Sequence, residues 1–361
     1  MAATDYYPQM QVKITTGAAS AGAAFPAMRG DRIEAAWLPI ERIEADQLSY
    51  EDFLTRYMHT NRPVVISGVA KDWAAMGTWT PENLKARFGN QPVAVGYERN
   101  MPFDTFIDQV LESSAEKPGP YMYRSFLHEV LPELLPDVMP QNKYAFARRY
   151  ASPLMPEKWR RPDGYLKLLI GGVGSKFPVM HFDGENSHAV ITQVYGEKEF
   201  VVFPPADGQY LYARKAFPNH SAVDDPVMQD RERWPLLAHA QPYRVVLMPG
   251  DMIFVPARWW HAARALSTSI SVCTNMLDPS NWAGFQEEVV AEQAKTSPRK
   301  ASRLKRRLTS VDKVLTRLER FQKRSFGLAR ALRFPAAIAP ISAEGTPDQS
   351  RKRLRIRIPT A

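Results

Sequence analysis

Three side chains in this chain have the types and the order of a metal site. His181 and Asp183 stand two positions apart in the segment FPVMHFDGENS, and His261 follows in PGDMIFVPARWWHAARAL. Alternate side chains of an extended strand point to the same face, so the first two could bind one ion together. Two imidazoles and one carboxylate form the facial triad that holds non-haem Fe(II) and leaves coordination positions open. The pattern therefore predicts a metal centre at these three residues.

The context of the His-x-Asp motif matters, because the motif alone arises often by chance and a lone histidine is commonly a core or surface residue. Here a strand-like run precedes the motif, and a pair of strand-like runs ending in FPP follows it. A Pro-Gly-Asp turn then leads through an apolar run to the distal histidine. This order of elements favours the metal site over a chance match.

Short strands must position these residues. From about Tyr165 onward, apolar or alternating runs are separated by Gly, Pro and polar residues, which is typical of β-strands and turns. The runs are LKLLIGGVG, AVITQVY, EFVVF, RVVLM, MIFV and SISVCTN. Such a density of short strands, with candidate ligands on or beside two of them, predicts a mainly β fold of the double-stranded β-helix or jelly-roll type.

Helices are expected before this β region. Thr80 is a suitable N-cap, with Pro81 at the first helical position. Pro63 to Ile66 is expected to be a short strand. The predicted helices are Leu48 to Thr60, Pro81 to Phe88, Met101 to Ser113 and Ser125 to Leu134.

Positive charge is concentrated in the last part of the chain. From Lys295 to the end there are 19 Lys and Arg against 4 Asp and Glu, a balance of +15. The whole chain of 361 residues carries +9, so the remainder carries about −6. A helix is predicted from about Pro298 to Phe334, because apolar residues recur at steps of three and four. These are Leu304, Leu308, Val311, Leu315, Leu318 and Phe321.

Two interpretations of this helix remain open from sequence. The apolar stripe favours docking on the β body or on a second subunit, which would give a homodimer through the C-terminal helices. The basic face could instead bind RNA, DNA or an acidic protein. The final stretch RKRLRIRIPT alternates cations with apolar residues, as an edge strand or a disordered basic end does.

Composition indicates a globular protein with a substantial core. The single cysteine, Cys273, cannot form an internal disulfide and is interpreted as a small buried hydrophobe. No run of 18 apolar residues occurs, so no membrane partner is expected. Residues 1 to 33 lack a Leu-rich stretch and are interpreted as a disordered leader rather than a signal peptide. These features predict a cytoplasmic protein.

As a set, the motifs resemble the JmjC-type branch of the cupin superfamily, the Fe(II)- and 2-oxoglutarate-dependent oxygenases. Within it they are most similar to the asparaginyl-hydroxylase group and its small bacterial relatives. The resemblance covers about residues 37 to 285. It includes an entry signature from Phe53 to Gly89, the segment from Tyr121 to Leu134, HFD, QVYGEKEFVVFPP, the WWH element and SISVCTN.

The resemblance also implies where 2-oxoglutarate binds. A buried dicarboxylate needs a cation, since an unpaired buried carboxylate is costly. In the resembled family the lysine of the G-x-K element, here Lys198, binds the distal carboxylate. Tyr121 matches a tyrosine that adds a hydroxyl to that carboxylate, and Asn275 matches an asparagine near the metal-bound end. Without the motif, Lys198 between Glu197 and Glu199 would be interpreted as a surface residue.

The chain departs from the family pattern at several positions. Pro178 stands where a Thr or Ser often supplies another hydroxyl. Tyr123 and Arg124 replace amide side chains, which bears on the choice of substrate. The stretch between HxD and G-x-K is two residues longer than in close relatives. A family asparagine after HxD therefore falls on one of three residues: Asn186, His188 or Ala189.

The resemblance implies a cupin-like jelly roll with flanking N-terminal helices and a basic, helical C-terminal extension. The expected boundaries are a leader at 1–33, an oxygenase domain at 34–285, a helical extension at 286–340 and a basic tail at 341–361. Residues 206 to 243 are long enough to cover the mouth of the site and select substrate. Trp259 and Trp260 could line the pocket or simply pack in the core.

The implied activity uses Fe(II), 2-oxoglutarate and O2 to hydroxylate a C–H bond in a protein or peptide side chain. The alternatives are a small-molecule hydroxylase, acting on a natural product or nucleoside, and an N-methyl-lysine demethylase. A non-catalytic cupin scaffold with a nucleic-acid-binding basic tail is less favoured, because the triad and Lys198 are both present.

Overall fold

The computed structural model describes residues 37–95, 99–145, 149–161, 165–227, 230 and 232–328, and it gives no side-chain description for 321–328. The expected leader and basic tail lie outside the described residues, as do the side chain of Phe321 and the end of the predicted C-terminal helix. Among the helices that are described, none combines the length and apolarity that crossing a bilayer requires.

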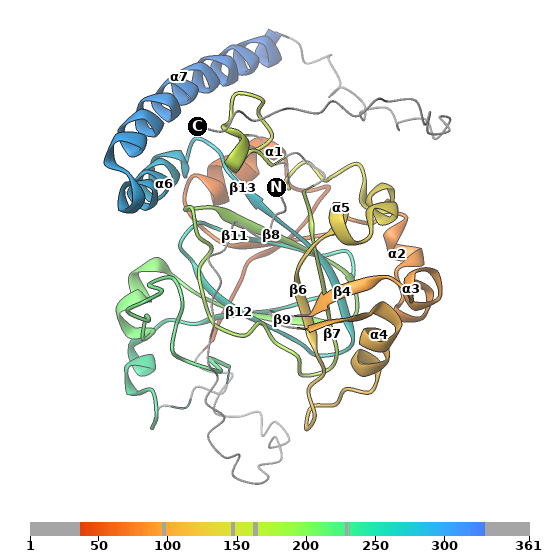
Figure 1. The fold of residues 1–361 in the computed structure, drawn as a ribbon. Coiled ribbons are helices and arrows are strands. Elements are labelled where there is room, and N and C mark those ends of the chain that lie inside the picture. The colour runs from red at the N-terminus through yellow and green to blue at the C-terminus, as the bar shows by residue number, and fades with distance from the viewer. Residues whose placement is uncertain are drawn as a thin grey trace, which may run out of the picture.

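Two β-sheets packed face to face form the body, with helices on one side and across one end (Figure 1). The strands are β1 (Leu38–Pro39), β2 (Arg42–Glu44), β3 (Val64–Ser67), β4 (Pro92–Val95), β5 (Arg99–Pro102), β6 (Tyr121–Phe126), β7 (Lys167–Gly171), β8 (His188–Tyr195), β9 (Lys198–Phe203), β10 (Tyr243–Leu247), β11 (Met252–Val255), β12 (Trp260–Ala265) and β13 (Ser269–Met276). The larger sheet has the order β2-β3-β11-β8-β13-β7-β6, and the smaller has β1-β10-β9-β12.

The chain passes repeatedly between the two sheets. Strand β8 lies in the larger sheet and β9 in the smaller, and β11, β12 and β13 alternate in the same way. Crossing from sheet to sheet is the pattern of a jelly roll, so the predicted fold class is confirmed. The expected strand runs all form strands, and β12 adds one that carries His261.

Strand β9 shows how the pleat sorts its side chains. Lys198, Phe200 and Val202 alternate with Glu199, and Phe200 and Val202 join the apolar core between the sheets. Glu199 faces the other way, where its buried carboxylate lies 2.5 Å from Arg244 Nε and 2.6 Å from Arg264 Nε. One strand therefore puts Lys198 inside the barrel and an ion-paired glutamate on its outer side.

The described helices flank the sheets, with α2 to α5 on the right of Figure 1 and α6 and α7 across the top. They are α1 (Tyr50–Phe53), α2 (Ala75–Thr78), α3 (Pro81–Phe88), α4 (Phe103–Leu111), α5 (Leu127–Val130), α6 (Trp282–Thr296) and α7 (Pro298–Leu328). A π-helix, η3 (Leu54–Met58), continues α1, and 3-10 turns occur at η4 (Pro132–Val138), η5 (Glu157–Trp159), η6 (Pro205–Tyr210) and η7 (Pro235–His239).

The helix predictions hold best where a local cap fixes the start. Helix α3 has the predicted bounds, and Thr80 caps it by accepting a hydrogen bond from the Asn83 N–H at 3.2 Å. The helix predicted at Leu48 to Thr60 starts two residues later, at Tyr50, after the Ser49 cap.

Two helix predictions are partly wrong because strand pairing overrides local preference. Met101 belongs to β5, and α4 begins only at Phe103. Ser125 and Phe126 pair with β7 instead of opening a helix. After the single turn of α5, Pro132 has no N–H to continue the helix and starts a 3-10 turn instead.

Helix α7 docks on the chain's own body, as one of the two sequence interpretations proposed. Leu308, Val311 and Leu315 are buried against α6 and the segment from Tyr150 to Trp159. Leu318 is 51% exposed, so the predicted stripe ends before it. The apolar face is therefore used within one chain. The predicted boundary between residues 285 and 286 falls inside α6.

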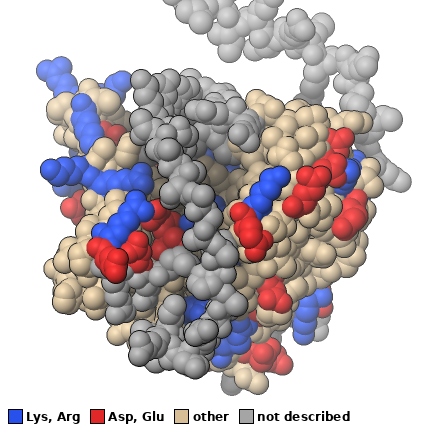
Figure 2. Space-filling model, turned by 90° about the horizontal axis from the view of Figure 1, so that it is seen from below, with Lys and Arg blue, Asp and Glu red and all other residues tan. Residues whose placement is uncertain are grey.

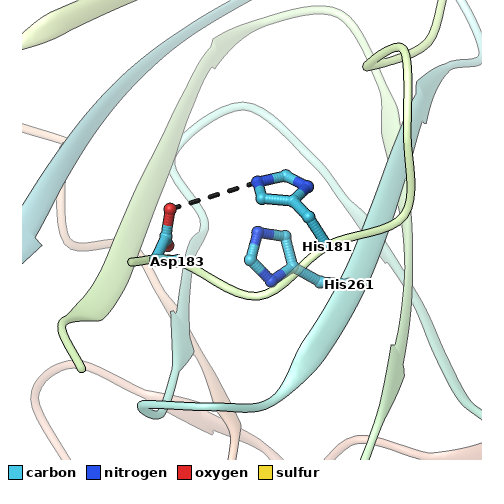
Figure 3. A group of neighbouring side chains, drawn as sticks. All are labelled: His181, Asp183 and His261. Carbon is cyan, nitrogen blue, oxygen red and sulfur yellow. Dashed lines mark ion pairs between the residues drawn. The ribbon is translucent and has the colours of Figure 1, made fainter. Parts of the chain in front are cut away.

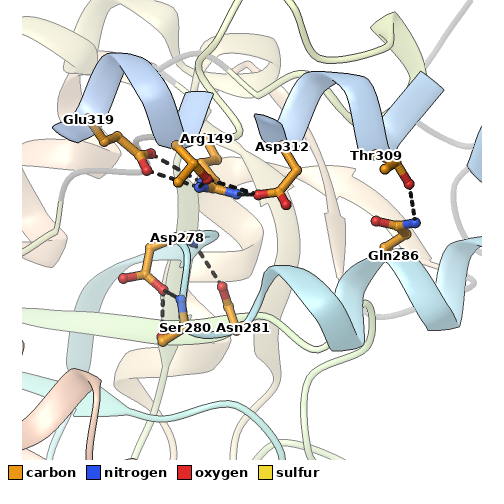
Figure 4. A network of polar contacts seen from close by, with 9 residues as sticks. Arg149, Asp278, Ser280, Asn281, Gln286, Thr309, Asp312 and Glu319 are labelled. Atoms are coloured by element: carbon orange, nitrogen blue, oxygen red, sulfur yellow. Dashed lines mark hydrogen bonds and ion pairs between the residues drawn. The ribbon is translucent and has the colours of Figure 1, made fainter. Parts of the chain in front are cut away.

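A buried arginine ties α7 down (Figure 4). Arg149 is 1% exposed, and its guanidinium lies 2.7 Å from Asp312 and 2.9 Å from Glu319, both on α7. It also donates to the Thr316 hydroxyl at 3.0 Å and lies over the Trp282 ring. A buried charge that loses its partner destabilises a fold strongly, so α7 is an integral part of this structure.

Replacing Leu308 with alanine is expected to lower the free energy of unfolding by about 2 to 5 kcal/mol, because a fully buried side chain is removed. Val314 lies on the same helix but is 46% exposed, so Val314→Ala should change stability by no more than about 0.5 kcal/mol. Urea unfolding of both variants measures the difference. Equal effects would show that α7 is not docked as described.

Candidate metal centre

The three predicted ligands meet between the sheets (Figure 3). His181 and His261 pair through their backbones, with N–H to carbonyl distances of 3.0 and 2.7 Å in the two directions. Their ring centroids lie 4.4 Å apart. Asp183 faces them, with an oxygen 4.0 Å from His181 Nε2. Residues 80 positions apart are thus brought together by one short antiparallel bridge.

Backbone carbonyl groups fix the orientation of both imidazole rings. His181 Nδ1 lies 3.1 Å from the Val179 carbonyl, and His261 Nδ1 lies 3.1 Å from the Trp259 carbonyl. Each Nδ1 therefore carries the proton, and each Nε2 presents its lone pair to the site. The three candidate ligand atoms lie within 4.8 Å of one another, which lets them converge on one ion.

The protonation states also suit metal binding. Burial, together with the neighbouring His261 ring, lowers the pKa of His181 to about 3. Burial alone would raise the pKa of Asp183, but the two imidazoles, Lys167 and a hydrogen bond from Asn275 outweigh it and leave this pKa below its usual range. At neutral pH the histidine is neutral and the aspartate ionised, as metal ligands must be.

Asn275 and Lys167 form the layer behind Asp183. Lys167 Nζ donates to Asn275 Oδ1 at 2.8 Å, which turns the amide nitrogen of Asn275 toward Asp183 and Ser187. The structure therefore places Asn275 beside Asp183, one of the three candidate metal ligands. Lys167 was not predicted as a site residue. Its only sequence signal is a single lysine inside the apolar run LKLLIGG.

Lys198 lies in the interior at 1% exposure. Its Nζ donates to the Ser271 hydroxyl at 2.8 Å and lies 5.2 Å from the centroid of the Tyr121 ring. Among the described residues no carboxylate lies within ion-pair distance of this ammonium, and burial lowers the pKa of Lys198 to about 7. A buried cation of this kind is suited to hold an anionic ligand.

The structure shows the surroundings of the positions at which the sequence departs from the family pattern. Pro178 is exposed, and Ser271 supplies the hydroxyl beside Lys198. His188 accepts from the Ala257 N–H at 2.8 Å and lies 3.2 Å from the Ser280 hydroxyl, so it is structural. Ala189 packs in the core opposite Asn275. The position across from Asn275 is therefore apolar.

The loop after Asp183 is held by α6. Glu185 and Asn186 have positive φ angles of 57° and 47°. The amides of Asn186 and Asn281 each donate to the other's backbone carbonyl, at 3.0 and 2.9 Å. Gly284 permits this approach, because a Cβ there would lie 2.2 Å from the Asn186 amide nitrogen. The metal-ligand loop is thus locked onto the first C-terminal helix.

This combination of fold and site matches a known family. The profile of the Cupin-like domain family matches residues 50–277, well over half of the chain. The chain belongs to the Cupin-like domain family. The match begins at α1 and ends one residue after β13, so it contains all three candidate ligands, Lys198 and Lys167.

Curated relatives of this cupin-like domain include JmjC proteins. It is 26% identical over 244 residues to Jumonji C domain-containing protein 5 of Drosophila melanogaster, covering 63% of this chain and 58% of that protein. It is 28% identical over 248 residues to lysine-specific demethylase JMJ21 of Arabidopsis thaliana, covering 66% of this chain and 25% of that protein. It is also 27% identical to 2-oxoglutarate and iron-dependent oxygenase JMJD4 of Danio rerio, over 70% of this chain and 65% of that protein. The matched region therefore spans less than two thirds of these relatives' own length.

An aromatic row lines one wall of the cupin-like domain beside the metal centre. Tyr121 stacks on Tyr123 at 6.0 Å, Tyr123 meets Phe177 edge to face at 4.7 Å, and Phe177 stacks on His181 at 4.3 Å. Tyr123 therefore builds the wall where the resembled hydroxylases carry an amide. Arg124 follows it on β6, at an irregularity in the pairing with β7.

The two tryptophans before His261 pack into different apolar clusters, Trp259 just before β12 and Trp260 at its first residue. Trp259 donates from Nε1 to the Asn61 carbonyl at 2.9 Å and belongs to the interior cluster. Trp260 meets Phe182 edge to face at 4.8 Å on the outer side. Both side chains are buried in apolar clusters, as the core-packing interpretation expects. Cys273 is partly buried on the inward side of β13 and packs against the interior apolar cluster, as a small hydrophobe does.

The described part of residues 206–243 folds back onto the HxD segment of the cupin-like domain (Figure 1, green, lower left). The Phe182 N–H donates to the Asn219 carbonyl at 3.1 Å, and the Ser221 N–H donates to the Met180 carbonyl at 2.8 Å. An apolar cluster with Trp260 secures the insertion; it includes Leu211, Val223 and Leu237. The insertion thus flanks the metal ligands.

Proposed function

We propose that this protein is an Fe(II)- and 2-oxoglutarate-dependent oxygenase that hydroxylates a C–H bond in a protein or peptide side chain. The observation that carries the proposal is the pairing of a converging His-Asp-His triad with a buried lysine in the same barrel. Relatives named as 2-oxoglutarate and iron-dependent oxygenases and as JmjC demethylases support it.

The side chains divide the work. His181, Asp183 and His261 would hold Fe(II), and Lys198 with Tyr121 would hold the distal carboxylate of 2-oxoglutarate. When bound, Fe(II) and 2-oxoglutarate supply, with O2, the oxidising power for the hydroxylation, and 2-oxoglutarate is converted to succinate and CO2. The apolar interior around Lys198 keeps water away, which strengthens electrostatic contacts to the ligand.

The names of the relatives support two outcomes on a protein substrate: hydroxylation and demethylation. Several are lysine- or arginine-specific demethylases, and oxidation of an N-methyl C–H bond uses the same chemistry. Demethylation is therefore the second candidate. A small-molecule substrate has no comparable support among these names.

The proposal is tested by incubating the purified protein with Fe(II), 2-oxoglutarate and a library of peptides prepared from a whole-cell lysate. Mass spectrometry should find a gain of one oxygen, or loss of a methyl group for the second candidate, together with succinate. Omitting 2-oxoglutarate is the control. Absence of any product and of succinate above that control, across peptides from a whole-cell lysate, would contradict the proposed activity.

The affinity for 2-oxoglutarate is expected to fall as pH rises above about 7. The pKa of Lys198 in the free protein is about 7, and a bound carboxylate raises it, so binding at higher pH must take up a proton. Affinity is then highest below pH 7 and declines by up to about tenfold per pH unit above it. Burial raises the pKa of Tyr121, and it raises the pKa of Cys273 to about 11, so both neighbours stay neutral in this range.

Calorimetry in buffers of different ionisation enthalpy measures this proton uptake directly. A pH-independent affinity between about pH 6 and 9 would show that Lys198 is charged throughout, and would contradict the expected pH dependence.

The exposed cations of α7 form a secondary part of the proposal. Nine with described, exposed side chains lie on this helix: Arg299, Lys300, Arg303, Lys305, Arg306, Arg307, Lys313, Arg317 and Arg320. On the face seen from below, by contrast, cations and acids are interspersed (Figure 2). We expect α7 to give weak, non-specific binding to nucleic acid that falls steeply with salt. A cytoplasmic location is likewise part of the proposal.

A further inference from the structure

The inner wall of the barrel carries a second lysine, at the end nearer the metal. Ser271, Cys273 and Asn275 alternate along β13, so their side chains share one face. Ser271 bonds Lys198 on this face, and Asn275 bonds Lys167. One wall therefore presents an ammonium group at each end, with Cys273 between them.

The register of the sheet explains how Lys167 reaches this place. It lies on β7 directly opposite Cys273 of β13, so both side chains emerge on the same side of the sheet. On β13, Cys273 lies between Ser271, which bonds Lys198, and Asn275, which bonds Lys167, so its thiol lies between the two cations. Leu169 follows two residues along β7 and is apolar and buried. The middle of the wall is thus apolar and its ends are basic.

Ala189 on β8 lies directly opposite Asn275 in the sheet. This position therefore offers no polar side chain to a ligand bound beside Asn275. A carboxylate that binds an ion beside Asp183 would face a second negative charge at close range. A cation next to both offsets that repulsion. Lys167 is placed for this role, since it contacts Asn275 and acts electrostatically on Asp183.

We propose that Lys167, with Asn275, binds the metal-end carboxylate of the 2-oxo acid, so that two lysines hold the two carboxylates of 2-oxoglutarate. The inference rests on the proposed function. It adds a residue whose charge selects for a carboxylate beside the metal, separate from the distal anchor at Lys198.

Binding rather than turnover tests this assignment, with Mn(II) in place of Fe(II). The probes are 2-oxoglutarate, which has both carboxylates, and pyruvate, which has only the metal-end one. Lys167→Met should weaken both by about 10- to 100-fold, whereas Lys198→Met should weaken only 2-oxoglutarate. Lys167→Arg keeps the charge and should retain most of the affinity. Lys176, which pairs with Asp225 on the surface, provides the control Lys176→Met, which should bind both probes normally.

The outcomes separate the alternatives. Unchanged binding of both probes by Lys167→Met would overturn the inference. A loss of Mn(II) affinity as large as the loss of probe affinity would also overturn it, because Lys167 would then act only by positioning Asp183 through Asn275. Failure of the unaltered protein to bind 2-oxoglutarate at all would instead overturn the proposed function.

Discussion

Replacing His181 or Asp183 with alanine is expected to abolish substrate oxidation and to leave the fold intact. Each change removes one of only three protein ligands, so metal affinity should fall by more than the roughly 10- to 100-fold that loss of an outer partner costs. Titration with Mn(II) or Fe(II) measures the affinity, and circular dichroism checks the fold. Metal affinity should fall further for Asp183→Ala than for His181→Ala, since two neutral imidazoles alone cannot balance the charge of a divalent ion.

The matched control is His59→Ala, which removes an exposed imidazole from the end of η3. This variant should bind metal and turn over like the unaltered protein. Near-normal turnover of either ligand variant, under conditions where the control also behaves normally, would rule out the His-Asp-His assignment.

Lys198→Met is expected to weaken 2-oxoglutarate binding by roughly 2 to 5 kcal/mol, the range for truncating one partner of a buried charge pair. Metal affinity should stay nearly unchanged, because Lys198 contacts Ser271 and Tyr121 rather than a ligand of the ion. The pH dependence described above should disappear with the amine. Calorimetry with Mn(II) present measures both the affinity and the proton uptake.

Arg264→Met is the control for this variant, because Arg264 is another largely buried cation, on the strand β12 that pairs with β9. Its side chain pairs with Glu199 on the other side of β9, so 2-oxoglutarate affinity should be kept while stability falls. If Arg264→Met loses the cosubstrate and Lys198→Met keeps it, the assignment of the anchor is wrong.

The ligands could be predicted from sequence because their signals are local. His181 and Asp183 share one extended segment, and Lys198 sits in a short motif that begins the next strand. The prediction that the distant His261 joins Asp183 in one site rested on the order of the elements along the chain, not on any local signal. In the folded jelly roll, one antiparallel backbone bridge brings His181 and His261 side by side.

Lys167 and Ser271 could not be predicted, because their roles depend on register. A shift of one residue between β7 and β13 would turn Lys167 away from Cys273 and out of the site. The same physics explains the errors at Ser125 and Met101, where strand partners distant in sequence decide the backbone. Local preference carries no information about such partners.

The contact between Asn186 and Asn281 has a thermodynamic consequence for the whole chain. Whatever ion binds Asp183 also restrains the loop that follows it, and that loop is bonded to α6. Linkage is reciprocal: to the extent that ion binding stabilises the docking of α6, loosening α6 lowers the affinity for the ion by the same factor. A substitution in the C-terminal helices can therefore produce the symptoms of an active-site defect without touching the reacting groups.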